Sequence, residues 1–276
     1  MKRKPFFTSV ILLPALLLFL FHPADARWSR VESRWGRSSS PRAFTPLSIP
    51  GCGLWLDAAV GVDYGTSYLV ESWDDRSPRG NDASGFTGAT EPLWSASDLS
   101  GCPAVRFDGI DDYLTAHSAA ALLSGNDTPF TLLAVLAIDP GSTEAGFQGA
   151  TADAASYIPW KACRRLSGNI RYMAKDYGNT KEVVGTTDYL TTAQVVTFVN
   201  NGISCALHQN GTNIGVGDAD IAIVILNYFW IGKTFGTSSG HFKGVIAQFL
   251  VYDRALSDAQ RGRVERYLMR RYGISG

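Results

Sequence analysis

The sequence feature that most constrains the fold is a long succession of short apolar runs, which turn residues interrupt between residues 49 and 252. The Asn-Gly pairs at 201–202 and 210–211 are typical of tight hairpin turns. Short strands at close spacing, with almost no helical periodicity between them, predict an all-β antiparallel sandwich or barrel rather than a parallel α/β sheet. The candidate strands are residues 53–57, 104–107, 130–138, 157–162, 170–175, 194–200, 204–209, 228–232 and 242–252.

The composition agrees with an all-β domain. The 276 residues are 45% hydrophobic, which is enough for one large apolar core. Aspartate outnumbers glutamate by 19 to 6 and glycine reaches 28, and both biases favour turns over long helices. Only 18% of the residues are charged and the formal net charge is zero. This argues against a disordered chain and against a basic nucleic-acid-binding protein.

One helix is predicted, at the C-terminal end of the chain. Ser257 can cap it, and Gln260 three residues later completes a capping box. An apolar stripe at helical spacing follows, and Gly273 is placed to end the helix. The stripe consists of Val264, Leu268 and Tyr272.

The first residues have the layout of a secretory signal peptide. Positive side chains at 2–4 precede an apolar run at 10–21, and small residues at 24 and 26 form a cleavage signal. The run is shorter than the roughly 20 residues that span a bilayer. We therefore predict a signal peptide at 1–26 and export to the extracellular space, the periplasm or the cell surface. Retention of this segment as an anchor is the alternative.

The predicted mature chain divides into a linker and one domain. Residues 27–47 are rich in Arg, Ser and Pro and show no periodicity, so we predict an exposed linker. Residues 48–276 form the predicted domain. No second long apolar run follows, so no membrane span is expected after signal cleavage.

Four cysteines lie in the predicted mature chain. None forms a Cys-x-x-Cys pair, so the sequence does not support a zinc site or a thioredoxin-like motif. An even number of cysteines in an exported protein suggests two disulfides, and we favour Cys52–Cys102 and Cys163–Cys205 among the three connectivities. Four buried free thiols are the alternative.

Four sequence segments occur in a fixed order between residues 50 and 274. They are Leu-Trp-Leu-Asp-Ala at 54–58 with Trp-Asp-Asp-Arg-Ser at 73–77, Pro-Ala-Val-Arg-Phe-Asp-Gly-Ile-Asp-Asp-Tyr-Leu at 103–114, Leu-His-Gln-Asn-Gly at 207–211, and Phe-Lys-Gly-Val-Ile-Ala at 242–247 with Val-Tyr-Asp-Arg-Ala-Leu-Ser-Asp at 251–258. Together they resemble the laminin-G-like members of the concanavalin A-like lectin/glucanase superfamily. The resemblance implies a jelly-roll sandwich of two curved antiparallel sheets, with the C-terminal helix packed against one of them.

Catalysis is not predicted. The glucanases of that superfamily use a Glu-x-Asp-x-Glu motif, which places carboxylates on one face of a strand. Only Glu71 of the mature glutamates has carboxylates within the next four residues, and its segment resembles a turn. The Gly-Thr-Ser-Ser-Gly string at 236–240 lacks the strand-to-helix context of a nucleophile elbow. A hydrolase built from distant carboxylates stays open.

A calcium site is a further hypothesis. Ca²⁺ takes oxygen ligands, and Asp108, Asp111 and Asp112 cluster around one predicted turn. Many concanavalin A-like domains hold Ca²⁺, so the resemblance adds support. The alternative is that these carboxylates only cap turn amides.

Aromatic side chains could form a platform for a sugar ring. The candidates on or near the central strands are Tyr157, Trp160, Tyr172 and Tyr177. Most aromatic residues in a sandwich are buried, and this alternative stays open for the four. We expect Trp230 in the core and treat His117 and His241 as ordinary surface or strand residues.

The leading functional hypothesis is a secreted, non-catalytic recognition module that binds carbohydrate or another extracellular polymer. A structural or adhesive cell-surface protein with protein partners is the alternative. A polysaccharide hydrolase or lyase is the third reading. The fold supports the first reading only by analogy, because fold does not determine function.

Overall fold

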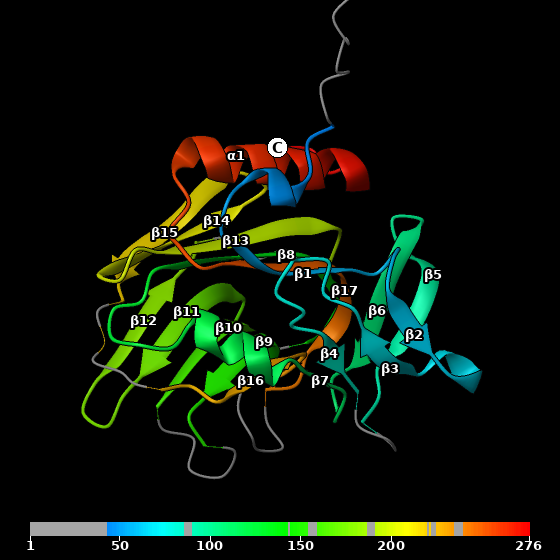
Figure 1. Ribbon diagram of the computed structural model, residues 1–276, viewed down its shortest axis with the longest axis horizontal. Helices are drawn as coiled ribbons and strands as arrows, with labels where there is room; N and C mark the ends of the chain where they lie inside the picture. The colour runs from blue at the N-terminus through cyan, green and yellow to red at the C-terminus, as the bar shows by residue number, and fades with distance from the viewer. Residues whose placement is uncertain are drawn as a thin grey trace, which may run out of the picture. The chain divides into compact units, whose positions relative to one another are not determined.

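Two antiparallel sheets face each other, and one α-helix lies on the outer side of one of them (Figure 1). The computed structural model describes residues 43–85, 90–142, 144–153, 159–186, 191–219, 221, 225–234 and 240–276. The predicted signal peptide and the predicted linker up to residue 42 lie outside these ranges. The folded unit begins at Phe44, four residues before the predicted domain boundary at residue 48. Among the described residues, no helix is both long enough and apolar enough to cross a membrane.

The sheet that carries the helix is called the back sheet. Eight described strands form it, in the order β15-β14-β13-β8-β17-β6-β5, with β1 also paired to β17. These strands are β1 (Cys52–Asp57), β5 (Leu93–Leu99), β6 (Cys102–Asp108), β8 (Phe130–Ile138), β13 (Gln194–Asn200), β14 (Ser204–Gln209), β15 (Thr212–Asp218) and β17 (Lys243–Tyr252).

The opposite sheet is called the front sheet. Nine described strands form it, in the order β12-β11-β10-β9-β16-β7-β4-β3-β2. These strands are β2 (Val62–Tyr64), β3 (Val70–Trp73), β4 (Ala83–Ser84), β7 (Leu114–Thr115), β9 (Glu144–Thr151), β10 (Trp160–Leu166), β11 (Asn169–Lys175), β12 (Thr180–Val184) and β16 (Tyr228–Ile231). Three short 3₁₀ segments are η1 (Pro46–Ser48), η2 (Thr66–Tyr68) and η3 (His117–Leu122). The two sheets confirm the predicted jelly-roll sandwich.

The back sheet separates two apolar cores. The larger one fills the space between the sheets, where Phe229 of the front sheet meets Phe249 of β17 with ring centroids 6.1 Å apart. The smaller one lies between the back sheet and the helix and includes Leu250 and Tyr252. Because both faces of β17 are covered, this strand is apolar almost throughout rather than alternating.

The helix α1 (Asp258–Tyr272) forms as predicted. Ser257 accepts a hydrogen bond from the Gln260 backbone, and the Gln260 side chain accepts one from the Ser257 backbone, which completes the capping box. Gly273 ends the helix in the left-handed conformation, with φ 63°. The predicted stripe of Val264, Leu268 and Tyr272 is buried in the smaller core.

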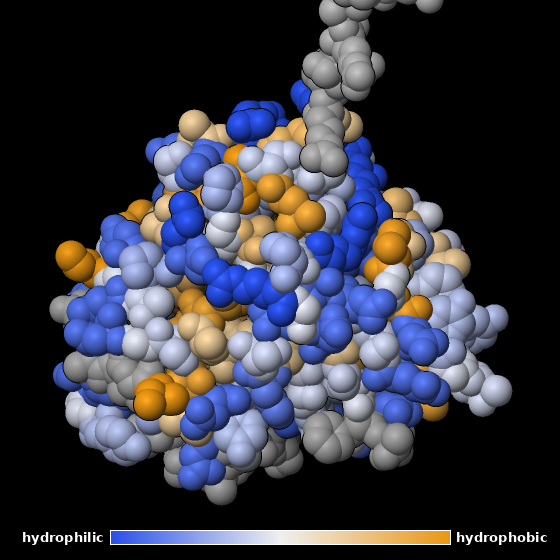
Figure 2. All heavy atoms as spheres, in the orientation of Figure 1, coloured by the Kyte–Doolittle hydropathy of each residue, from blue (hydrophilic) through white to orange (hydrophobic). Residues whose placement is uncertain are grey.

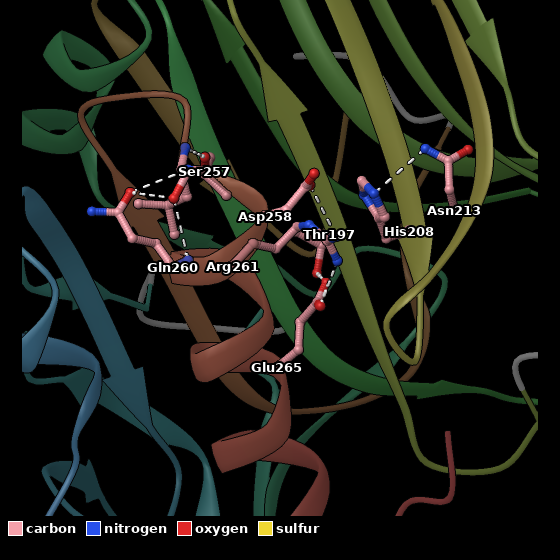
Figure 3. Close-up of polar contacts among 10 residues, drawn as sticks. Thr197, His208, Asn213, Ser257, Asp258, Gln260, Arg261 and Glu265 are labelled. Carbon is pink, nitrogen blue, oxygen red and sulfur yellow. Dashed lines mark hydrogen bonds and ion pairs between the residues drawn. The ribbon is translucent and has the colours of Figure 1, made fainter.

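Polar contacts also hold α1 on the back sheet (Figure 3). The buried carboxylate of Glu265 accepts hydrogen bonds from the Thr197 hydroxyl at 2.8 Å and from the Arg261 guanidinium at 2.6 Å. Near the other end of the helix, Arg271 forms two hydrogen bonds of 2.9 Å to the buried carboxylate of Asp57. Both buried carboxylates are thus neutralised by helix arginines, which a buried charge requires.

The predicted disulfides are absent, and all four cysteines are free thiols, which is the alternative that the sequence left open. Cys163 lies in β10 and Cys205 in β14, on opposite sheets, and packed sheets ordinarily lie about 10 Å apart. A disulfide needs Cα atoms about 4.4–6.8 Å apart. Cys52 and Cys102 belong to β1 and β6, which pair with different halves of β17. Burial raises the pKa of Cys52 to about 12.

Candidate functional site

The outer face of the front sheet carries a group of aromatic rings, imidazoles and one lysine that belongs to neither apolar core. Alternation along β16 directs Phe229 and Ile231 into the larger core, so Tyr228 and Trp230 face outward. Register places Trp160 of β10 on the same face, because Thr151 of β9 pairs with both Trp160 and Tyr228. The outward rings of β10 and β16 therefore flank β9, two inter-strand spacings apart.

Lys233 is the central residue of this group. Its Nζ lies 3.4 Å from the ring centroid of Tyr113 and 4.9 Å from that of Trp230, which is cation–π geometry. The side chain is 6% exposed and forms no ion pair with any residue that the structure describes. Burial lowers the pKa of its ammonium to about 8.

Two histidines complete the group. The His117 ring meets Tyr228 edge-to-face with centroids 4.9 Å apart, and its Nδ1 accepts a hydrogen bond from the Phe229 backbone. His241 is buried, and its Nδ1 lies 3.5 Å from the Asp112 carbonyl oxygen. Burial lowers the pKa of both rings, which favours neutral imidazoles at pH 7. We call this group the aromatic–lysine cluster; it consists of Tyr113, His117, Tyr228, Trp230, Lys233 and His241.

Two glycines of β9 let the chain around Lys233 lie directly on the sheet. A Cβ atom built on Gly149 would lie 1.8 Å from the Thr234 carbonyl oxygen. One built on Gly146 would lie 2.3 Å from the Gly240 carbonyl oxygen. Only glycine permits so close an approach of two backbones, so these positions fix where Lys233 and His241 sit.

The three predicted calcium ligands lie together next to this cluster. One oxygen each of Asp108, Asp111 and Asp112 lies within 4.8 Å of the others. Asp112 is 6% exposed, and burial, with the charges of the other two, raises its pKa to about 7. The turn-capping alternative also holds in part. The Asp112 carboxylate accepts a hydrogen bond from the Asp108 backbone amide, and the Asp108 carboxylate accepts one from the Ile110 backbone amide. The carboxylates offer the oxygen ligands that Ca²⁺ prefers.

The predicted aromatic platform is only partly assembled. Trp160 lies on the outer face of the front sheet, 7% exposed. Tyr172 is corrected to a core residue, because its ring is fully buried between the sheets and its hydroxyl accepts a hydrogen bond from Asn200. Tyr177 is 81% exposed in the turn after β11, three strands away from β16. Tyr157 lies outside the described residues.

The aromatic–lysine cluster is not predictable from any motif in the sequence. Trp230 is buried, as predicted, but it packs outside both apolar cores. In the sequence His117 and His241 resemble ordinary surface or strand residues, and Lys233 belongs to no motif. The available signal was the alternation around Trp230 within the apolar run 228–232, which directs every second ring away from the core.

Comparisons with known proteins concern the fold. No protein-family model and no curated protein sequence matches the chain. It is similar in structure to the binding domain of Paraclostridial Mosquitocidal Protein 1, with a TM-score of 0.59 and 12% identity over 79% of this chain and 52% of that chain. It is also similar to domain 4 of AbnA, an extracellular arabinanase from Geobacillus stearothermophilus, in complex with arabinotriose. The TM-score is 0.58, and the identity is 13% over 78% of this chain and 98% of that chain.

A third similar structure is the CBM40 of the Ruminococcus gnavus IT-sialidase bound to alpha2,3 sialyllactose, with a TM-score of 0.50 and 14% identity over 59% of this chain and 95% of that one. The chain spans about half the length of the toxin binding domains that it matches. At these identities the similarity establishes a shared β-sandwich fold. Assignment to the laminin-G-like group stays a prediction.

Proposed function

We propose that this protein is an exported, non-catalytic module that binds carbohydrate through the aromatic–lysine cluster. The position of Lys233 carries the proposal, because its buried ammonium lies against two rings and has no carboxylate partner among the described residues. Aromatic faces complement the C–H faces of sugars, and the ammonium and imidazoles supply hydrogen-bonding groups for hydroxyls. A few convergent polar groups among apolar rings are typical of ligand sites.

The similar structures favour carbohydrate as the ligand class. Domain 4 of the arabinanase is in complex with arabinotriose, and the sialidase CBM40 is bound to sialyllactose. The resemblance to laminin-G-like domains and the signal-peptide layout of residues 1–26 support export. An adhesive protein with extracellular protein partners is the alternative.

We also propose that Asp108, Asp111 and Asp112 hold Ca²⁺ beside the cluster. Three crowded carboxylates repel one another, and a divalent cation would offset that repulsion. We expect Ca²⁺ to raise the melting temperature of EDTA-stripped protein, and Asp111→Asn to abolish that increase. An unchanged melting temperature on adding Ca²⁺ would leave the three residues as turn caps only.

The test of the binding site is a glycan array screened with the mature protein, with Ca²⁺ and with EDTA. We expect selective glycan binding that Tyr228→Ala and Lys233→Met each weaken at least tenfold. Tyr177→Ala is the matched control, because this exposed tyrosine lies three strands away. Loss of binding only in the control variant would move the site to the turn after β11. A silent array with folded protein would favour the adhesive alternative.

A polysaccharide hydrolase or lyase is a second candidate, and one observation favours it. Asp112 has a pKa raised to about 7 next to other carboxylates, which suits a general acid. We expect no oligosaccharide products when the protein is incubated with the glycans that it binds. Products that disappear in Asp112→Asn would replace the binding proposal with an enzymatic one.

A further inference from the structure

The helix α1 bears arginines of two kinds. Arg261 and Arg271 are paired with carboxylates, as described above. A second set is exposed and forms no ion pair with any residue in the described part of the chain. This set consists of Arg263, Arg266 and Arg270. Figure 2 shows strongly hydrophilic side chains interspersed with apolar ones at the top of the view, where Figure 1 places α1.

The three unpaired arginines line a groove together with two aromatic rings. The groove has a volume of about 360 Å³, and Phe44 and Tyr267 form the rest of its lining. The Arg263 guanidinium lies 4.8 Å from the Phe44 ring centroid. Phe44 and Tyr267 meet edge-to-face with centroids 5.9 Å apart. We call this feature the arginine groove.

Helix stability does not account for these charges. Positions 263, 266 and 270 follow the i, i+3, i+7 spacing of one helix face and extend over about 10 Å of helix. Like charges three or four residues apart destabilise a helix. Attraction to the helix dipole stabilises cations only in the last turn, so it explains Arg270 but not Arg263 or Arg266. A ligand that supplies negative charge would offset the repulsion.

We propose that the arginine groove binds an anionic polysaccharide through its sulfate or carboxylate groups. Guanidinium groups pair with such planar or tetrahedral anions in bidentate geometry, and the Phe44 and Tyr267 rings can pack against sugar C–H faces. A nucleic acid is disfavoured because its binding needs a broad basic surface, and the chain has a formal net charge of zero. The groove lies on the back-sheet side of the molecule, so the surface is independent of the aromatic–lysine cluster.

The test compares a sulfated, a carboxylated and a neutral polysaccharide, of which dextran sulfate and dextran share one backbone. The probes are dextran sulfate, polygalacturonate and neutral dextran, with affinities measured by calorimetry between 50 and about 300 mM salt. We expect the full chain to bind at least one of the two anionic polymers and not neutral dextran, and the relative affinities for dextran sulfate and polygalacturonate distinguish sulfate from carboxylate recognition. In R263Q/R266Q/R270Q the affinity should fall at least tenfold, and the slope of log affinity against log salt should fall by up to about three.

The control variant removes the same charge elsewhere. R79Q/K243Q/R254Q changes three exposed cations that do not line the groove and should keep the affinity within about twofold at equal net charge. Circular dichroism checks that both variants fold. An equal loss in both variants, no binding of either anionic polymer, or equally tight binding of duplex DNA would each overturn the proposal. Tyr228→Ala should leave dextran sulfate binding unchanged, so failure here is distinct from failure of the proposed front-sheet site.

Discussion

At the scale of single residues, burial shifts the pKa values of two ionisable groups in opposite directions. These two groups, Lys233 and Asp112, flank the Tyr113–His241 pair. Lys233 contacts the Tyr113 ring, and the Asp112 carbonyl contacts His241. Burial lowers the pKa of Lys233 to about 8 and raises that of Asp112 to about 7. Both shifts favour the neutral form, because desolvation penalises charge.

The Lys233 shift predicts a rise in stability with pH. Between pH 8 and 10.5 the Lys233 amine is protonated to a smaller extent in the folded protein than in the unfolded one. The free energy of unfolding therefore rises with pH over that window. Relative to Lys233→Met, which has no such group, the wild type should gain about 1–3 kcal/mol of unfolding free energy between pH 8 and 10.5. Urea unfolding of both proteins at several pH values measures the difference. If the unfolding free energies of the two proteins changed with pH in parallel, Lys233 would be solvated rather than buried.

The Asp112 shift predicts the opposite dependence. A carboxyl whose folded pKa exceeds the unfolded one stabilises the fold fully below about pH 4 and loses that contribution as pH rises to 7. Relative to Asp112→Asn, the metal-free wild type should therefore lose about 2–4 kcal/mol between pH 4 and 7.5. Guanidinium unfolding in EDTA tests this. A wild type that gains stability over the same window would contradict the raised pKa.

At the scale of elements, β9 positions the aromatic–lysine cluster. Its Gly149 lies under the Thr234 carbonyl, and β16 pairs along its edge. β9 is not among the strands predicted from the sequence, because the glycines in Glu-Ala-Gly-Phe-Gln-Gly-Ala-Thr interrupt its apolar pattern. The same glycines that interrupt the apolar pattern of β9 allow the segment around Lys233 to lie directly on this strand.

The close contact at Gly149 predicts a large effect of one methyl group. Gly149→Ala should displace Thr234 and Lys233, destabilise the protein by about 1–3 kcal/mol and weaken glycan binding, because the neighbouring backbone must move. Gly178→Ala is the matched control, since its Cβ would meet only one atom, at 3.8 Å, and its φ is ordinary. Thermal unfolding and the glycan array together test this. Equal stability of the two variants would refute the contact.

At the scale of the whole molecule, the arrangement of the two sheets separates the cysteines. Cys163 and Cys205 face the common core from opposite sheets, and both are fully buried. Cys102 is half-buried at the start of β6. Thiol accessibility therefore follows from sheet topology rather than from cysteine spacing in the sequence.

This topology predicts how the thiols react. In native protein a thiol reagent should modify Cys102 alone, and the other three only after unfolding, because buried thiols with raised pKa form little thiolate. A reducing agent should leave the melting temperature unchanged. Mass spectrometry of alkylated peptides shows which cysteines are modified in the native and in the unfolded protein. Disulfide-linked peptides from natively expressed protein would restore the prediction made from the sequence.

The sequence by itself determined the features that depend on neighbouring residues. Alternating apolar runs with Asn-Gly turns indicated the sandwich, and the Ser257–Gln260 pair located α1, because strand alternation and helix capping are local. Asp108, Asp111 and Asp112 come together for the same reason, since one turn contains all three.

Only the tertiary structure decided which rings face the core and which face outward. Tyr172 and Trp230 both occur in apolar runs, and strand register directs the first inward and the second outward. The cluster unites Tyr113, Lys233 and His241, which are more than 100 residues apart at the extremes, because β16 pairs with both β7 and β9. Such contacts depend on strand order and register, which are set by the packing of the whole sandwich.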